Sequence, residues 1–97
     1  MKVTTEKKEN TTVLIVEGDV DTLTAPELDN AVAAAAPGCE KLIMDLGGVD
    51  YISSAGIRVI VKTRRTVGGE GLTLRNVTPN VTDVLKMTGF LRVLNIE

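Results

Sequence analysis

The sequence predicts an α/β fold, with one mixed β-sheet of four to five strands and α-helices packed mainly on one face. Short apolar, β-branched segments alternate with longer segments in which apolar residues recur at helical spacing. The first two strand segments are separated only by a short turn, so they pair antiparallel and the sheet cannot be purely parallel. The length of 97 residues and the hydrophobic content of 43% suit a single domain over residues 1–97.

The chain begins with a hairpin followed by a helix. Residues 2–8 are polar and predict an edge strand, and residues 13–16 are apolar and predict its buried partner. A helix is expected from Thr24, because Thr24 and Glu27 have the spacing of a capping box. Pro37 and Gly38 end this helix. Its buried stripe is expected to comprise Leu28, Ala31, Val32 and Ala35.

A second strand and helix follow. Residues 42–46 predict a core strand, and residues 54–66 predict a helix that ends at Gly68-Gly69. Helical spacing predicts a buried side formed by Ile57, Ile60 and Val61. The same spacing places Arg58, Lys62 and Arg65 in a basic stripe. Val59 is expected to lie opposite the buried side and to be exposed.

The C-terminal third repeats the pattern on a smaller scale. Residues 72–74 predict a short strand, and Thr78-Pro79 predicts the start of a third helix that Gly89 closes. The inner face of this helix is expected to comprise Val81, Val84 and Leu85. Residues 91–96 form either a last strand or a terminal turn.

Composition excludes several classes of function. Histidine is absent and Cys39 is the one cysteine, which excludes Ser-His-Asp catalysis, zinc clusters and disulfides. The net charge of −2 offers no basic excess for nucleic acid. The N-terminus is polar, and the longest apolar run, residues 31–36, is too short to span a bilayer, so we expect a cytoplasmic protein without a membrane contact.

Acidic residues allow two catalytic or signalling interpretations. Asp19 and Asp21 have the spacing that opens haloacid-dehalogenase-type phosphatases, but those enzymes are much larger and need a Lys and a further acidic pair for Mg²⁺. A receiver-like aspartyl phosphoacceptor domain would use Asp45 at the end of its strand. Asp19 and Asp45 are too close in sequence to fit the elements that separate the corresponding residues of a receiver.

A third interpretation rests on residues 42–61, LIMDLGGVDYISSAGIRVIV, which resemble the signature of the STAS domain of anti-sigma-factor antagonists (anti-anti-sigma factors). That signature is an apolar strand ending in Asp-Leu, an aromatic-apolar pair, a Ser two residues before a Gly, and an aliphatic helix. Gly18, Asp21 and the pair Thr24-Ala25 match the family's other box, and residues 77–91 resemble its C-terminal helix. The resemblance therefore covers essentially the full chain and implies a STAS-like single domain.

The resemblance implies a binding switch with no catalysis, cofactor or metal of its own. In the family, an anti-sigma factor that is also a serine kinase with a histidine-kinase-like ATPase fold binds the unphosphorylated antagonist and releases its sigma factor. The kinase then phosphorylates the Ser two residues before the Gly, which ends binding, and a PP2C-type phosphatase restores it. That Ser corresponds to Ser54, and the family's conserved-box Asp corresponds to Asp21.

The sequence departs from the family pattern at the residue before the phosphoacceptor. This residue is commonly Asp in the family and is Ser53 here. The Ser53 hydroxyl is a rival phosphoacceptor, or it could cap the helix. Gly56 is expected to let a kinase approach the backbone. The residues expected to contact the partner are Asp21, Ser53, Ser54, Gly56, Ile57, Arg58, Val59 and Lys62. A STAS interaction module outside sigma-factor control and an aspartyl phosphoacceptor remain as alternatives.

Overall fold

The computed structural model describes residues 1–68 and 70–97, so the part of the predicted helix end that falls on Gly69 lies outside the described residues. The strands in the described chain are β1 (Lys2–Lys8), β2 (Thr11–Glu17), β3 (Lys41–Gly48), β4 (Leu72–Arg75) and β5 (Asn95–Ile96). The helices there are α1 (Ala25–Ala35), α2 (Ser54–Val67), α3 (Pro79–Met87) and the 3₁₀ turn η1 (Phe90–Arg92).

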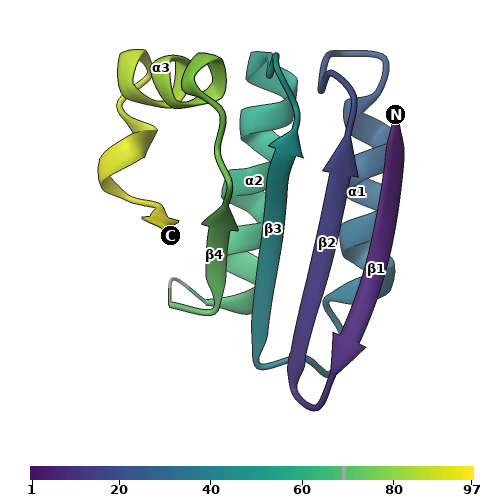
Figure 1. The fold of residues 1–97 in the computed structure, drawn as a ribbon. Helices are drawn as coiled ribbons and strands as arrows, with labels where there is room; N and C mark the ends of the chain where they lie inside the picture. The colour runs from purple at the N-terminus through teal and green to yellow at the C-terminus, as the bar shows by residue number, and fades with distance from the viewer. Residues whose placement is uncertain (69) are drawn as a thin grey trace.

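The strands form a mixed sheet with the order β1-β2-β3-β4-β5 (Figure 1). β1 pairs antiparallel with β2 through the hairpin predicted from the sequence, and Glu9 in its turn has a φ of 56°. All other neighbouring strands are parallel. The mixed α/β sheet expected from the sequence is therefore confirmed, and the C-terminal segment contains both the turn and the strand that the sequence allowed.

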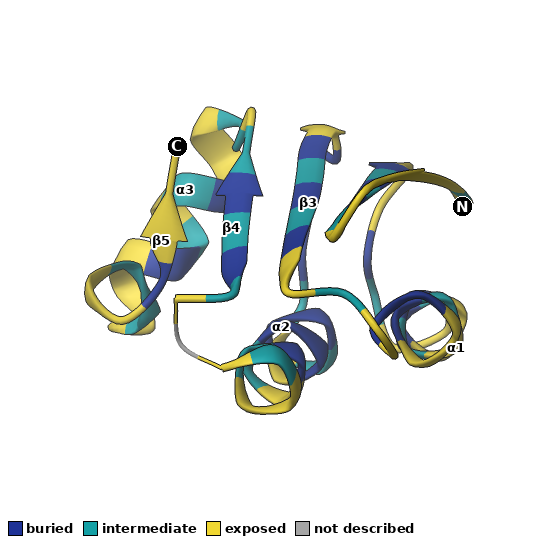
Figure 2. Ribbon diagram, turned by 90° about the horizontal axis from the view of Figure 1, so that it is seen from below, coloured by how far each residue is buried: buried dark blue, intermediate teal, exposed yellow. Residues whose placement is uncertain are grey.

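Helices α1 and α2 cover the same face of the sheet (Figure 2). The alternation of strand side chains explains the core, because β2 and β3 direct every second residue toward these helices. The buried strand residues on this face are Thr12, Leu14, Val16, Leu42, Met44, Leu46, Leu72 and Leu74. Leu28 and Val32 of α1, and Ile57 and Ile60 of α2, are buried against them.

The sheet face opposite α1 and α2 explains why some predicted core positions are only half-buried. Ile43 is one of these positions, because it points away from the helices and pairs in register with Val13 of β2. Ile15 lies on the same face and is half-buried as well. A continuous apolar strand segment does not reveal in the sequence which of its faces the helices cover.

Candidate functional site

Two loops meet at the carboxyl ends of β2 and β3, at the top of Figure 1. The backbone N–H of Gly18 donates to the carbonyl of Gly48 at 2.9 Å, and the N–H of Val20 donates to the carbonyl of Tyr51 at 2.9 Å. The N–H of Ser53 in turn donates to the carbonyl of Val20 at 2.8 Å. These bonds hold the loop that carries Asp21 beside the start of α2, so the two sequence segments expected to converge do lie together.

The two adjacent serines have different environments. Ser53 is the N-cap of α2, and its hydroxyl accepts a hydrogen bond from the backbone N–H of Gly56 at 3.4 Å, which confirms the predicted cap. Ser54 is the first residue of α2 and is exposed. The first N–H groups of a helix have no intrahelical acceptor, so Ser54 lies where the helix can tolerate a negative charge. Of the two adjacent serines, Ser54 is the exposed one, and Ser53 is the one whose hydroxyl the helix uses.

Gly56 is buried beneath this site, which contradicts the expected approach of a kinase to its backbone. A Cβ atom at Gly56 would lie 2.6 Å from side-chain atoms of both Val20 and Ile52. These two residues form the parallel bridge that joins the loops. The glycine is thus required because the first turn of α2 packs directly on the bridge.

The replacement Gly56→Ala is expected to destabilise the fold by about 1–3 kcal/mol, the usual cost of overpacking a core. Helix propensity alone would give the opposite sign, a gain of up to about 1 kcal/mol. Urea denaturation of the two proteins measures the difference. A gain in stability would contradict the close packing of Gly56 on Val20 and Ile52.

Asp21 organises its own loop. Its Oδ1 atom accepts hydrogen bonds from the backbone N–H groups of Leu23 and Thr24, both at 2.9 Å. The Thr24 hydroxyl accepts from the N–H of Asp21 at 2.9 Å and donates to the carbonyl of Asp19 at 2.8 Å. The predicted capping box is therefore wrong, because Thr24 is the N-cap residue of α1 but its hydroxyl is used by the loop before the helix.

The hydrogen bonds to its carboxylate lower the pKa of Asp21 below its ordinary value of 3.8, chiefly through the backbone N–H of Thr24 and then through the Thr24 hydroxyl, which lies 3.1 Å from Oδ1. Because the folded pKa is depressed, the stabilisation by the ionised carboxylate is complete above pH 3.8 and is lost as the pH falls through the lower folded value. Carbon-detected NMR titration of Asp21 in the folded chain and in urea should give a lower midpoint for the folded chain. Equal midpoints would contradict this loop geometry.

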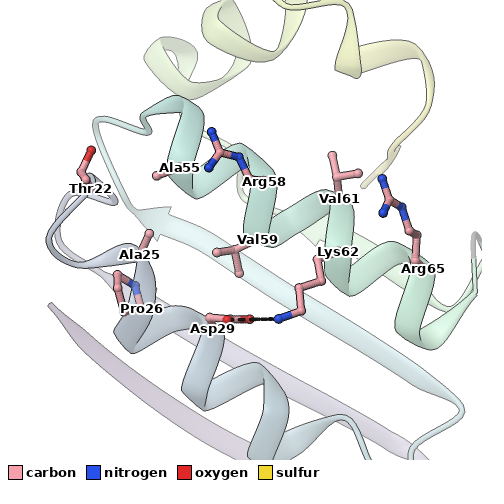
Figure 3. Close-up of a pocket in the computed structure, with 10 residues that line it drawn as sticks. All are labelled: Thr22, Ala25, Pro26, Asp29, Ala55, Arg58, Val59, Val61, Lys62 and Arg65. Atoms are coloured by element: carbon pink, nitrogen blue, oxygen red, sulfur yellow. Dashed lines mark hydrogen bonds and ion pairs between the residues drawn. The ribbon is translucent and has the colours of Figure 1, made fainter.

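A hollow between α1 and α2 begins next to these loops (Figure 3). Lys62 reaches across it, and its ammonium group lies 3.2 Å from the carboxylate of Asp29 on α1. Val59 points into the hollow and is only 8% exposed, so its predicted exposure is wrong. Val59 lies on the flank of α2 that faces α1, and this flank is buried because the two helices pack side by side on the sheet. Ile57 is also buried, at 4% exposed.

Two exposed apolar side chains lie in the loops of the site, and sequence reasoning missed the exposure of both. Leu23 follows Asp21 by two residues and is 86% exposed, and Tyr51 in the second loop is 51% exposed. Single apolar residues in polar loops carry no periodic pattern, and the sequence marked only Tyr51, as the aromatic residue of the family signature, without predicting its exposure. Leu23 and Tyr51 therefore give these two loops exposed apolar side-chain area.

Asp45, the residue that a receiver-like interpretation would use, is held by hydrogen bonds at the end of β3. Asp45 accepts hydrogen bonds from the N–H of Gly47 at 2.9 Å and from the amide of Asn76 at 3.1 Å, which is the loop-closing role expected for a strand end. Among residues 1–68 and 70–97, no three His, Cys, Asp or Glu side chains are grouped to hold a metal ion. In the same residues, no helix is long and apolar enough to cross a membrane.

Comparison with known proteins gives a consistent result. The STAS domain family model matches residues 2–97. BtrV of Bordetella bronchiseptica, a proposed anti-sigma factor antagonist, is 36% identical over an alignment that covers 99% of this chain and 85% of BtrV. RsfB of Mycobacterium tuberculosis, an anti-sigma-F factor antagonist, is 28% identical over 68% of this chain and 55% of RsfB.

Solved structures share the whole fold. A crystal structure of an anti-sigma factor antagonist from Mycobacterium paratuberculosis superposes with a TM-score of 0.87 at 26% identity, over 98% of this chain and 83% of that one. The anti-sigma factor antagonist SpoIIAA in its unphosphorylated form gives a TM-score of 0.81 at 16% identity, over 99% and 88% of the two chains. The likeness to SpoIIAA is one of fold.

Proposed function

This chain belongs to the STAS domain family, and from that premise we propose that it acts as an anti-sigma factor antagonist. Its unmodified form binds an anti-sigma factor and thereby frees a sigma factor, and phosphorylation of Ser54 ends the binding. The relatives at 36% and 26% identity support the first part. The observation that carries the second is the exposed Ser54 hydroxyl at the first position of α2, beside a Ser53 hydroxyl that the helix already uses.

The physics of such a switch acts on the interface. A phosphate on Ser54 adds about 1.5 to 2 negative charges at a helix N-terminus, where the free N–H groups accommodate them. A partner packed over Ser54 would have to desolvate those charges or oppose them, which costs far more than a surface contact gains. Asp21 adds a further negative charge in the neighbouring loop.

The proposed anti-sigma factor is a serine kinase with a histidine-kinase-like ATPase fold, and a PP2C-type phosphatase removes the phosphate. The chain itself acts by binding and needs neither a cofactor nor a catalytic centre, and its proposed place of action is the cytoplasm. The proposed partner surface consists of Leu23, Tyr51, Ser54, Arg58 and Lys62, together with the loop that Asp21 holds. Gly56, Ile57 and Val59 are buried, so they shape this surface from below and offer little side-chain area to the partner.

Affinity capture from an extract of the host tests the function. The unmodified chain is expected to recover a protein with a kinase-type ATPase domain, and purified sigma factor should then be released from that protein by the chain. A Ser54→Asp bait is the matched control and should recover much less. Recovery of a protein that binds no sigma factor would overturn the proposal in favour of a STAS interaction module outside sigma-factor control.

Leu23→Asp is expected to weaken binding of the captured anti-sigma factor about tenfold or more, because an apolar contact becomes a buried charge. Met87→Asp is the matched control, since Met87 is also 86% exposed but lies at the end of α3. Both proteins should keep their stability within about 0.5 kcal/mol, as exposed positions do. Calorimetric titration of each variant with the anti-sigma factor measures the effect, and equal losses for both would contradict the proposed surface.

A further inference from the structure

The hollow between α1 and α2 shares Arg58 and Lys62 with the proposed partner surface and extends beyond it to α1 and Arg65. It encloses about 550 Å³ and is lined by the loop at Thr22, the first turns of α1 and the outward side of α2. Its base is apolar, with Ala25 and Val59 at 5% and 8% exposed. In Figure 3, Val59 and Lys62 point across toward α1, while Arg58 and Arg65 extend from the other side of α2.

The charge along this hollow is strongly one-sided. Three cations line it, namely Arg58, Lys62 and Arg65, and Asp29 is the one carboxylate among the lining residues. Asp29 is already paired with Lys62. In the part of the chain that the structure describes, the other ion pair joins Arg75 and Glu97, so Arg58 and Arg65 have no carboxylate within 4.0 Å. The lining residues therefore carry two guanidinium groups that no carboxylate of the described chain neutralises.

We propose that this hollow is a docking site for an acidic, amphipathic segment of the protein partner. An apolar side chain of the segment would pack on Ala25 and Val59, and its carboxylates would pair with Arg58 and Arg65. The two arginines are seven residues apart, about 10 Å along α2, which matches carboxylates spaced over two turns of a helix or three residues of a strand. Arginine pairs with carboxylates through two parallel hydrogen bonds, so the site favours the side chains of glutamate and aspartate over other sources of negative charge that cannot form such a pair.

This inference rests on the proposed function and adds a reason for the direction of the switch. Ser54 and Arg58 are four residues apart on α2 and are therefore neighbours on the helix surface. A phosphate on Ser54 would attract the Arg58 guanidinium and would repel an incoming carboxylate at the same place. Phosphorylation would thus weaken binding in two ways. It would place negative charge at the N-terminus of α2, and it would pair with Arg58, one of the two arginines proposed to hold the acidic segment.

A direct test uses the full chain, labelled with ¹⁵N, and a short synthetic peptide in which two glutamates alternate with two leucines. NMR shift changes are expected at Ala25, Val59 and the backbone around Arg58, and they should weaken at high salt. The same peptide with glutamine in place of glutamate is expected to bind at least about tenfold more weakly. The double variant Arg58→Glu/Arg65→Glu should lose the binding, whereas Lys86→Glu/Arg92→Glu carries the same charge change on exposed residues elsewhere and should keep it.

Several outcomes would overturn the inference. These are shift changes located elsewhere, equal binding of the glutamine peptide, or loss of binding in the Lys86→Glu/Arg92→Glu control alone. Concentration-dependent shifts at Ala25 and Val59 without peptide would assign the hollow to a second copy of this chain instead.

The captured anti-sigma factor separates this inference from the proposed function. A loss of about tenfold or more with Arg58→Glu/Arg65→Glu, but not with the control, is the expected result. If Ser54→Asp abolishes capture while the arginine variant binds normally, the docking site is wrong and the proposed function stands. If the acidic peptide binds the hollow but no anti-sigma factor is captured, the proposed function is wrong and the docking site stands.

Discussion

Phosphorylation of Ser54 is expected to weaken binding of the anti-sigma factor about a hundredfold or more. The physical reason is that like charge placed inside an interface costs several kcal/mol, and about 2.7 kcal/mol corresponds to a hundredfold change. Ser54→Ala should bind as the unmodified chain does but accept no phosphate, so that sigma release is locked on. Ser54→Asp should bind poorly, although a single carboxylate charge only partly imitates phosphate. Titration calorimetry with the captured anti-sigma factor measures all three.

Ser53→Ala is the matched control for the switch. This variant should still be phosphorylated by the captured kinase and should lose about 1 kcal/mol of stability, because the hydrogen bond that the Gly56 N–H donates to the Ser53 hydroxyl is gone. Fragmentation mass spectrometry after incubation with kinase and ATP locates the phosphate. Phosphate on Ser53 or on another hydroxyl, with Ser54 unmodified, would overturn the assignment. A phosphate that hydroxylamine removes would indicate an aspartyl acceptor instead.

The replacement Ile60→Ala should reduce the free energy of unfolding by about 2–5 kcal/mol. Ile60 is fully buried and lies on the face of α2 that packs on the sheet, so the truncation leaves a cavity as well as losing apolar contact. A loss of this size is a large fraction of the stability of a small domain. Val61→Ala is the control, since Val61 is only half-buried, which shows that its predicted full burial was wrong, and it should cost about 1 kcal/mol or less. A loss below about 1 kcal/mol for Ile60→Ala would contradict the orientation of α2.

The elements of the fold were predictable because each has a local cause in the sequence. The Glu9-Asn10 turn between two strand segments required an antiparallel pair, and the polar residues of 2–8 marked that strand as the sheet edge. Ser53 before the aliphatic run of α2 predicted both the start of the helix and its cap. The two loops lie together because they follow neighbouring parallel strands, which end at one edge of the sheet.

The predictions that were wrong concern residues whose surroundings depend on contacts with residues outside their own local sequence pattern. Val59 was expected to be exposed because helical spacing was interpreted with a single buried face, the one on the sheet. In the structure α1 also packs against α2, and it buries Val59. Thr24 has the capping-box pattern, but its hydroxyl forms hydrogen bonds with the backbone of Asp19 and Asp21 in the preceding loop and does not cap α1. The need for glycine at position 56 lies in the side chains of Val20 and Ile52, which no local pattern reveals.

The position of Ser54 at the first residue of α2 also bears on how long each form of the protein survives in the cell. Proteases degrade small domains mainly through their unfolded fraction, which depends on the free energy of unfolding. A phosphate that the helix N-terminus accommodates leaves that fraction almost unchanged, so both forms should have similar lifetimes. Under the proposed switch, phosphorylated molecules would persist as a dormant reserve, and dephosphorylation would restore activity without new protein synthesis. The ratio of kinase to phosphatase activity, and not turnover, would set the active amount.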